Sequence, residues 1–184
     1  MTKAPSITRR QATLGAVLAT TAPLPAFGAI EKTPAAPTLE FVFEAMILLA
    51  PPVELGTVDG ARRRFVPITG GTVSGPRLRG KVLAGGGDWQ AIGEERTAVH
   101  ARYTLEAADG TPILIDNVGV RVAKPDIIAR LTAGEDLDPA LYYFRTTPVF
   151  EVQAGPHDWM TRNVFVGQGI RHPDSVVLRV FRVT

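Results

Sequence analysis

The chain has 184 residues, of which 45% are hydrophobic and 21% charged, and this is the size and composition of one globular domain rather than of a disordered chain. It has no cysteine, which excludes disulfides, thiol catalysis and cysteine-ligated metal sites. No apolar run reaches the roughly 18 residues of a membrane-spanning helix. With 20 basic and 18 acidic residues, the charge is too balanced to indicate a nucleic-acid-binding tail.

Residues 1–28 have the pattern of an export signal. The adjacent Arg9 and Arg10 precede a mildly apolar stretch, which resembles a twin-arginine signal. Small residues at Ala26 and Gly28 predict cleavage after Gly28, whereas the alternative is an N-terminal helix that stays on the protein. Cleavage predicts a periplasmic protein with 17 basic and 18 acidic residues, because the segment carries three basic residues and no acidic one. We therefore expect neither nucleic acid nor, after removal of the signal, a membrane as partner.

Residues 29–37, rich in proline and alanine, are predicted to be a linker, and residues 38–184 to form the domain. Apolar residues alternate with others from Leu39 to Leu49, which predicts a long half-buried strand that ends before Pro51-Pro52. Glycine-rich turns separate a series of shorter predicted strands. These strands cover residues 53–55, 62–68, 71–74 and 78–82.

A β-hairpin is predicted from Thr97 to Val122, with its turn at Asp109-Gly110. Residues 124–133 have helical spacing, and strands are predicted again over 141–152, 163–167 and 175–183. About eight strands and one short helix in one small domain favour an all-β fold. The expected architecture is a single closed antiparallel β-barrel, because closure removes exposed strand edges.

Six short runs of sequence occur in an order that is typical of a known family. They are Pro67–Gly71, Gly75–Gly80, Gly86–Trp89, Ala101–Leu105, Tyr142–Pro148 and Phe165–Gly167. Together they resemble an uncharacterised bacterial and fungal family, the domain of unknown function DUF3237, also called uncharacterised protein family UPF0311, from Thr38 to the C-terminus. The resemblance implies a compact closed barrel of the lipocalin or allene-oxide-cyclase kind, and no settled activity. Its usual Trp-Leu-Asn segment has a different spacing here, between Trp159 and Asn163.

The predicted strand 141–152 carries a candidate catalytic set. Tyr143, Arg145 and Glu151 share one face, and they supply a phenol, a guanidinium and a carboxylate. If this face is the interior, Arg145 could bind a ligand carboxylate or stabilise an oxyanion, with Tyr143 as the proton donor. The opposite face, which includes Phe144 and Phe150, is more apolar and could equally be the core. Arg145 would then be a surface residue paired with Glu151.

Other polar residues occur where an interior face is predicted. Asp88, after three glycines, is either a general acid or base or a turn cap, and Glu151 is either such a group or a solvated strand end. Tyr103 shares an apolar face and serves either ligand binding or packing. Asn117 and Arg121 share a face with two isoleucines, so they line a cavity or the strand twists outward.

Three further residues complete the predicted ligand-binding set, namely Trp89, Trp159 and Asn163. Trp159 is predicted at a barrel mouth, either as a lid or as a packing residue. The three histidines are scattered, and the glycine-rich segments lack the ending of a phosphate-binding loop. We therefore expect no metal and no cofactor.

These features predict a protein that binds a small organic molecule in the barrel interior. The first hypothesis is a cofactor-free enzyme that performs acid–base isomerisation, cyclisation or lyase chemistry. The alternatives are a non-catalytic carrier of a hydrophobic small molecule and an interaction module with a solid core. The sequence leaves the oligomeric state open.

Overall fold

The structure, a computed structural model, describes residues 35–184, so the predicted export signal and most of the linker lie outside the described residues. Ten antiparallel strands form one sheet. They are β1 (Leu39–Leu49), β2 (Val53–Val58), β3 (Ala61–Ser74), β4 (Gly80–Val82), β5 (Gly87–Ile92), β6 (Arg96–Ala107), β7 (Pro112–Val122), β8 (Tyr143–Glu151), β9 (Phe165–Arg171) and β10 (Ser175–Val183). Within residues 35–184, no helix has the length and hydropathy required to cross a membrane.

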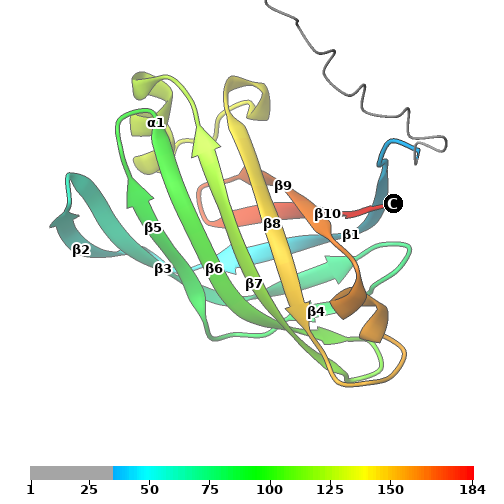
Figure 1. Cartoon of the computed structure of the whole chain (residues 1–184). Coiled ribbons are helices and arrows are strands. Elements are labelled where there is room, and N and C mark those ends of the chain that lie inside the picture. The colour runs from blue at the N-terminus through cyan, green and yellow to red at the C-terminus, as the bar shows by residue number, and fades with distance from the viewer. Residues whose placement is uncertain (1–34) are drawn as a thin grey trace, which may run out of the picture. The chain divides into compact units, whose positions relative to one another are not determined.

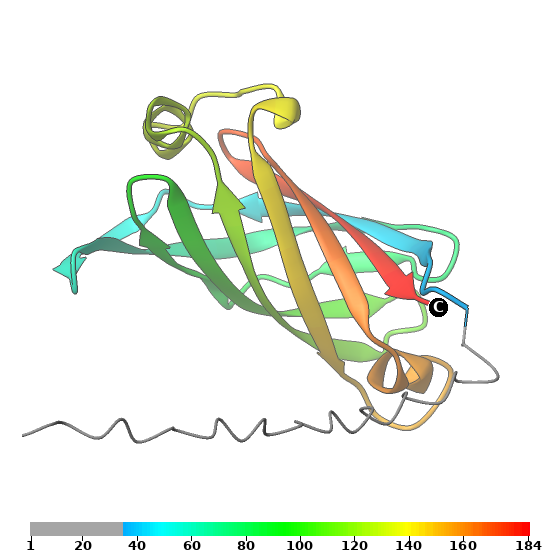
Figure 2. The ribbon, with the colours of Figure 1, turned by 45° about the horizontal axis from the view of Figure 1, so that its top comes forward.

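The sheet closes into a barrel because β3 pairs with β1 as well as with β4 and β5 (Figures 1 and 2). From β1 the strand order is β10, β9, β8, β7 and β6, and then β4 and β5 share one position between β6 and β3. β2 pairs with the first part of β3 and projects beyond the barrel. The predicted closed antiparallel barrel of about eight strands is confirmed, with two extra strands.

Individual strands differ from the prediction where glycines interrupt them. The bounds of β1 and β10 agree with the predicted ones, but β3 is one continuous strand across Gly70-Gly71, where a turn was predicted. Gly71 has a φ of +146°, and a Cβ there would lie 1.9 Å from the Met46 carbonyl oxygen. Glycine therefore permits the close approach of β3 to β1 that closes the barrel. The prediction omitted β5 because the preceding glycines suggested only a turn.

Short helices cover the two ends of the barrel (Figure 1). At one end, α1 (Pro125–Thr132) and the 3₁₀ helix η1 (Pro139–Leu141) follow β7, and α1 buries Ile127, Ile128 and Leu131. At the other end lies the 3₁₀ helix η2 (Asp158–Arg162), between β8 and β9. The main apolar core contains Phe150, whose ring centroid lies 5.0 Å from that of Phe165. The polar interior described next is toward the α1 end.

Candidate functional site

The burial pattern of β8 decides which of its faces lines the barrel. Phe144, Thr146 and Phe150 are buried, whereas Tyr143 and Glu151 are exposed and Arg145 is half-buried. The apolar face is therefore inside, because closure of the barrel buries the phenylalanines and the period of two turns the intervening residues outward. Interior placement of Tyr143, Arg145 and Glu151 was one of the two predicted options, and it is wrong.

These three residues also do not form one polar group on the surface. The Arg145 guanidinium stacks on the Tyr143 ring at 5.1 Å, and its Nη1 donates to the Phe144 carbonyl oxygen at 2.9 Å. Glu151 is not paired with Arg145 but lies 3.9 Å from Nη2 of Arg102. The alternative prediction, with the apolar face as the core and Arg145 on the outer face, is confirmed, and only its pairing of Arg145 with Glu151 is wrong.

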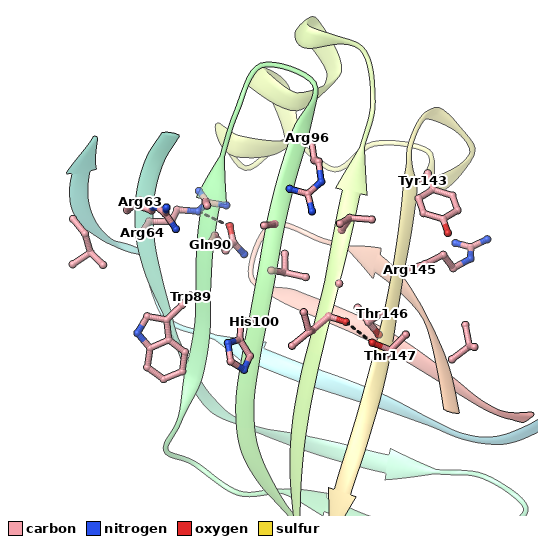
Figure 3. Close-up of a pocket in the computed structure, with 18 residues that line it drawn as sticks. Arg63, Arg64, Trp89, Gln90, Arg96, His100, Tyr143, Arg145, Thr146 and Thr147 are labelled. Atoms are coloured by element: carbon pink, nitrogen blue, oxygen red, sulfur yellow. Dashed lines mark hydrogen bonds between the residues drawn. The ribbon is translucent and has the colours of Figure 1, made fainter. Parts of the chain in front are cut away.

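A broad groove of about 770 Å³ runs over the outer face of β5, β6, β7 and β8 (Figure 3). It gathers Trp89, Tyr143 and Arg145 with Arg96 and His100. Trp89 is 48% exposed, and its position on β5 turns it away from the barrel interior. None of these side chains can therefore contact a molecule held inside the barrel.

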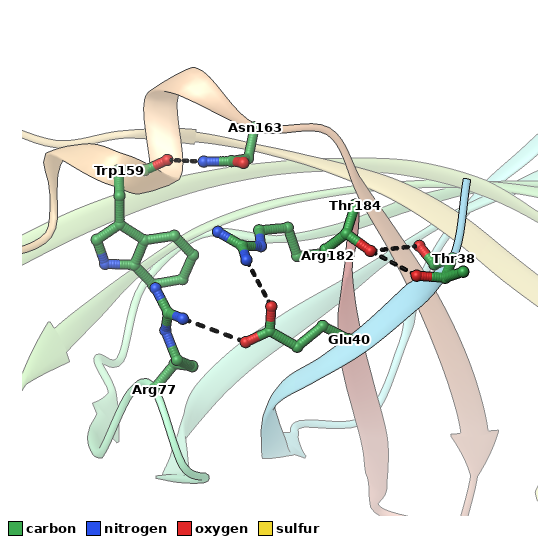
Figure 4. Close-up of polar contacts among 7 residues, drawn as sticks. All are labelled: Thr38, Glu40, Arg77, Trp159, Asn163, Arg182 and Thr184. Carbon is green, nitrogen blue, oxygen red and sulfur yellow. Dashed lines mark hydrogen bonds and ion pairs between the residues drawn. The ribbon is translucent and has the colours of Figure 1, made fainter. Parts of the chain in front are cut away.

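Trp159 and Asn163 lie at the η2 end (Figure 4). The Arg77 guanidinium stacks on the Trp159 ring at 4.8 Å, and Asn163 Nδ2 donates to the Trp159 carbonyl oxygen at 2.6 Å. Glu40 binds both Arg77, at 3.2 Å, and Arg182, at 2.6 Å. Through Arg77 and Glu40, these contacts connect η2 to β1 and β10 at this end of the barrel.

Asp88 projects from β5 into the barrel, where its carboxylate accepts two hydrogen bonds. Gln90 Nε2 donates to Oδ2, and the backbone N–H of His100 donates to Oδ1 at 3.0 Å. Burial raises the pKa of the Asp88 carboxyl above its ordinary value, although these two donors and the charges of Arg121 and Arg64 act in the opposite direction. A carboxyl whose pKa is raised by burial holds its proton more tightly and is suited to act as a proton donor.

Arg121, on the inner face of β7, is 1% exposed. Its Nε and Nη2 have no hydrogen-bond partner among the described residues, and its guanidinium lies 5.8 Å from the centroid of the Phe144 ring. Burial, together with the charges of Arg64 and Arg171, lowers the pKa of Arg121 from 12.5 to about 10. Unpartnered buried donors cost about 1–3 kcal/mol each, so the folded protein is destabilised by this side chain.

Two more buried arginines face the same space. Arg64, on β3, donates from Nε to Gln90 Oε1 at 2.8 Å, and Arg171, at the end of β9, donates from Nη2 to the Pro173 carbonyl oxygen at 3.0 Å. Burial lowers the pKa of both guanidinium groups. Asp88 is inside, but the Asp174 carboxylate at the rim is exposed, so positive charge predominates at this end of the barrel.

A cavity of about 170 Å³ separates these groups, roughly the liquid volume of six waters. Its charged and polar lining residues are Arg64, Asp88, Gln90, Arg121, Arg171 and, at the rim, Asp174. A second cavity of about 40 Å³ shares Asp88 and Phe144 with the first and extends to Tyr103, Asn117 and Thr146. We call the two together the interior pocket.

Most of the unsatisfied buried polar atoms in residues 35–184 lie on the inner face of the barrel, and five of them belong to residues that line the interior pocket. Of the nine buried side-chain polar atoms without a hydrogen-bond partner in residues 35–184, six belong to inward-facing residues of β6, β7 and β8. These are Thr97 Oγ1, Tyr103 Oη, Asn117 Oδ1, Arg121 Nε, Arg121 Nη2 and Thr146 Oγ1. Burial and the nearby Asp88 raise the pKa of Tyr103, so its phenol stays neutral and can donate a hydrogen bond. Such a concentration of free donors and acceptors is expected where a ligand or ordered water binds.

The structure thus brings together four of the ten predicted site residues, Asp88, Tyr103, Asn117 and Arg121. Of the predicted alternatives, Asn117 and Arg121 line a cavity and the strand does not twist outward. Arg64, Gln90 and Arg171, which line the same cavity, are not among the predicted site residues. The sequence did contain an indication for the first two, because Arg64 shares its strand face with Val66 and Ile68, and Gln90 shares its face with Asp88.

Comparison with known proteins places the chain in a family. The family model described as "Protein of unknown function (DUF3237)" matches residues 37–183. The chain belongs to this family. A UPF0311 protein of Rhodopseudomonas palustris (strain TIE-1) is 37% identical over 150 residues, covering 80% of this chain and 98% of the relative. A UPF0311 protein of Clostridium acetobutylicum is 37% identical over 147 residues, 79% of this chain and 93% of the relative.

Solved structures share the fold. A protein of unknown function from Rhodopseudomonas palustris has a TM-score of 0.77 at 36% identity, covering 81% of this chain and 100% of its own. A "beta-barrel like protein" from Acinetobacter baumannii has a TM-score of 0.72 at 34% identity, covering 83% of this chain and 99% of its own. The chain therefore shares the barrel fold of these two proteins.

One more distant relative has an enzyme name. "Hydroalkoxylation enzyme phnH" of Penicillium herquei is 31% identical over 88 residues, 47% of this chain and 58% of its own length. The crystal structure of an enzyme from the same fungus has a TM-score of 0.62 at 19% identity, covering 83% of this chain and 98% of its own. At that identity the likeness shows the fold alone.

Proposed function

We propose that this protein is an enzyme that performs acid–base addition or elimination on a small organic molecule in the interior pocket. The observation that carries the proposal is the Asp88 carboxyl, which faces the interior pocket with a raised pKa and has Tyr103, Asn117 and Arg121 around the same cavity. A proton donor enclosed with a neutral phenol and a guanidinium can both deliver a proton and stabilise charge on a substrate oxygen.

The name of the Penicillium relative suggests a reaction class for this chemistry. In a hydroalkoxylation, a hydroxyl group adds across a carbon–carbon double bond. Protonated Asp88 would give its proton to one alkene carbon, while the substrate oxygen forms a bond to the other carbon. The hydroxyl proton then returns to the Asp88 carboxylate, so the acid is regenerated and the addition involves no net oxidation or reduction. The reverse sequence is an elimination.

The neighbouring groups would assist without exchanging a proton. Tyr103 Oη and Asn117 Oδ1 have no hydrogen-bond partner among the described residues, so they are available to a substrate hydroxyl. The Gln90 and His100 donors hold the carboxyl in position. A carrier of a hydrophobic molecule is supported less well, because Asp88 and three buried arginines line the larger cavity of about 170 Å³.

A direct test uses a panel of ortho-allylphenol derivatives, with and without ring carboxylates, whose ring closure creates a stereocentre. We expect the protein to give one enantiomer in excess and to incorporate deuterium from heavy water at the protonated carbon. Asp88→Asn should abolish both effects while retaining the fold. The matched control is Asp116→Asn, because Asp116 lies on the outer face of β7 and binds His100 Nε2 at 2.8 Å. Racemic product throughout, or activity unchanged in Asp88→Asn, would contradict the proposal.

A further inference from the structure

The unpartnered edge of the Arg121 guanidinium group indicates which kind of molecule the interior pocket binds. The two unpartnered atoms of Arg121 are Nε and Nη2. In a guanidinium group these two nitrogens lie on the same edge, and their N–H bonds point in parallel. This edge matches the two oxygens of a carboxylate, which it can bind through two hydrogen bonds at once.

The charges around that edge favour an anion. Arg64, Arg121 and Arg171 all face the cavity, and they are 3%, 1% and 9% exposed respectively. Arg64 and Arg171 have neutral partners, since they donate to Gln90 and to backbone carbonyl groups. The carboxylates opposite them are Asp88, inside, and Asp174, exposed at the rim, and neither lies within 4.0 Å of these guanidinium groups in the described part of the chain. None of the three arginines therefore forms an ion pair with these carboxylates, although Asp88 acts on Arg64 and Arg121 and Asp174 acts on Arg171 at longer range.

The rest of the cavity wall indicates an organic rather than an inorganic anion. Leu49, Val66, Phe144 and Val176 flank the arginines, so the ligand's body would contact apolar groups. Phe144 packs so closely on Gly169 of β9 that a Cβ there would lie 2.4 Å from its ring, which fixes the ring as a rigid wall. A hydrated phosphate or sulfate would leave this wall without contacts.

We propose that the interior pocket is a binding site for the carboxylate of a small organic acid, anchored side-on by Nε and Nη2 of Arg121. The inference builds on the proposed function, because it names the substrate class as a carboxylate-bearing molecule whose reacting end faces Asp88 and Tyr103. Arg171 and Arg64 contribute charge, and the apolar wall accepts the carbon skeleton.

Calorimetric titration of the full chain with benzoate, and with the neutral benzamide of the same shape, tests this site. We expect benzoate to bind and benzamide to bind at least roughly tenfold more weakly, since hydrogen bonds to charged groups are involved. Arg121→Met should weaken benzoate binding roughly 10- to 100-fold. Arg102→Met is the control, because Arg102 is exposed on β6 and should leave binding unchanged. Equal binding of both probes, no benzoate binding, or equally tight binding of sulfate would overturn the proposal.

A measurement on the unaltered protein covers the possibility that Arg121→Met folds poorly. Benzoate should shift the Nε–H resonance of one arginine side chain in the nitrogen–proton NMR spectrum, whereas benzamide should not. The absence of any arginine Nε–H shift at saturating benzoate would overturn the assignment to Arg121.

Failure of the carboxylate site and failure of the proposed enzyme activity would give different experimental results. Asp88→Asn removes the one carboxyl inside the cavity that can ionise, so it should bind benzoate at least as tightly as the unaltered protein while losing turnover. Benzoate binding without Asp88-dependent turnover of the allylphenols would contradict the enzyme proposal alone. Asp88-dependent turnover with equal affinity for benzoate and benzamide would contradict the carboxylate site alone.

Discussion

Arg121 should make the ligand-free protein less stable than it would be with an apolar residue in its place. The substitution Arg121→Met keeps an unbranched side chain of similar length and removes the charge and the two unpartnered donors. Arg121 is 1% exposed, so water does not screen the cost of its charge. We therefore expect Arg121→Met to be stabilising when no ligand is bound.

The size of this effect follows from the pKa of Arg121. Its fall from 12.5 to about 10 corresponds to about 3 kcal/mol of unfavourable free energy for the charged, folded form. The sign is destabilising at every pH below about 10, because the unfolded chain holds the proton more tightly. Loss of the contact with the Phe144 ring offsets about 1 kcal/mol. The net gain is about 2 kcal/mol, or roughly 4–8 °C in Tm for a domain of this size.

Thermal unfolding followed by circular dichroism, together with urea denaturation at neutral pH, measures this gain. Arg102→Met is the matched control, because its partner Glu151 is 3.9 Å away at an exposed site, and it should change stability by less than about 0.5 kcal/mol. If Arg121→Met lowered the free energy of unfolding by 2 kcal/mol or more, roughly the size of the expected gain, the guanidinium would have to be paired in the folded protein. The argument for an anion site would then fail with it.

Three further substitutions test the interior. The pKa of Asp88 is raised in the folded protein, so the free energy of unfolding of the unaltered protein should fall as pH rises from below 3.8 through the folded-state pKa. Asp88→Asn lacks this titration, so its stability relative to the unaltered protein, measured by urea denaturation, should increase over the same pH window. Tyr103→Phe should leave stability unchanged or raise it, because the Tyr103 hydroxyl has no hydrogen-bond partner among the described residues. Tyr142→Phe should cost about 1 kcal/mol, because the Tyr142 hydroxyl accepts a hydrogen bond from the backbone N–H of Arg171 at 3.0 Å. Equal losses of stability in the two variants would show that Tyr103 is hydrogen-bonded. Phe150→Ala should cost about 3–5 kcal/mol and Val149→Ala, on the outer face, almost nothing, and similar values for both would contradict the placement of the β8 faces.

The barrel was predictable because its strands and turns have local signals. The alternation in β1 and β10 and the Asp109-Gly110 turn determine those elements without reference to the rest of the chain. The glycines before β5 were ambiguous, because a glycine serves a turn or a close strand approach equally well.

The site was predictable only in part. Tyr103, Asn117 and Arg121 lie on strands with a clear apolar face, so their polar groups could be recognised as unusual. One face of β8 is more apolar, but the other carries Tyr143, Arg145 and Glu151, which could equally have lined a polar ligand site, and only barrel closure decides between the two faces. Arg171 was missed because it is the last residue of β9, a strand in which Gly167 and Gly169 occupy the inward positions that apolar residues would have marked.

The account depends most on the protonation of Asp88 inside the barrel. Carbon-13 NMR of the aspartate carboxyl groups as a function of pH measures it directly, and Asp88→Asn assigns the signal by its loss. We predict that the Asp88 carboxyl titrates above the ordinary value of 3.8, and that the signal of Asp109, which accepts a hydrogen bond from the Thr111 backbone, titrates below it. An Asp88 carboxyl that titrates at or below 3.8 would contradict the assignment of this residue as the proton donor.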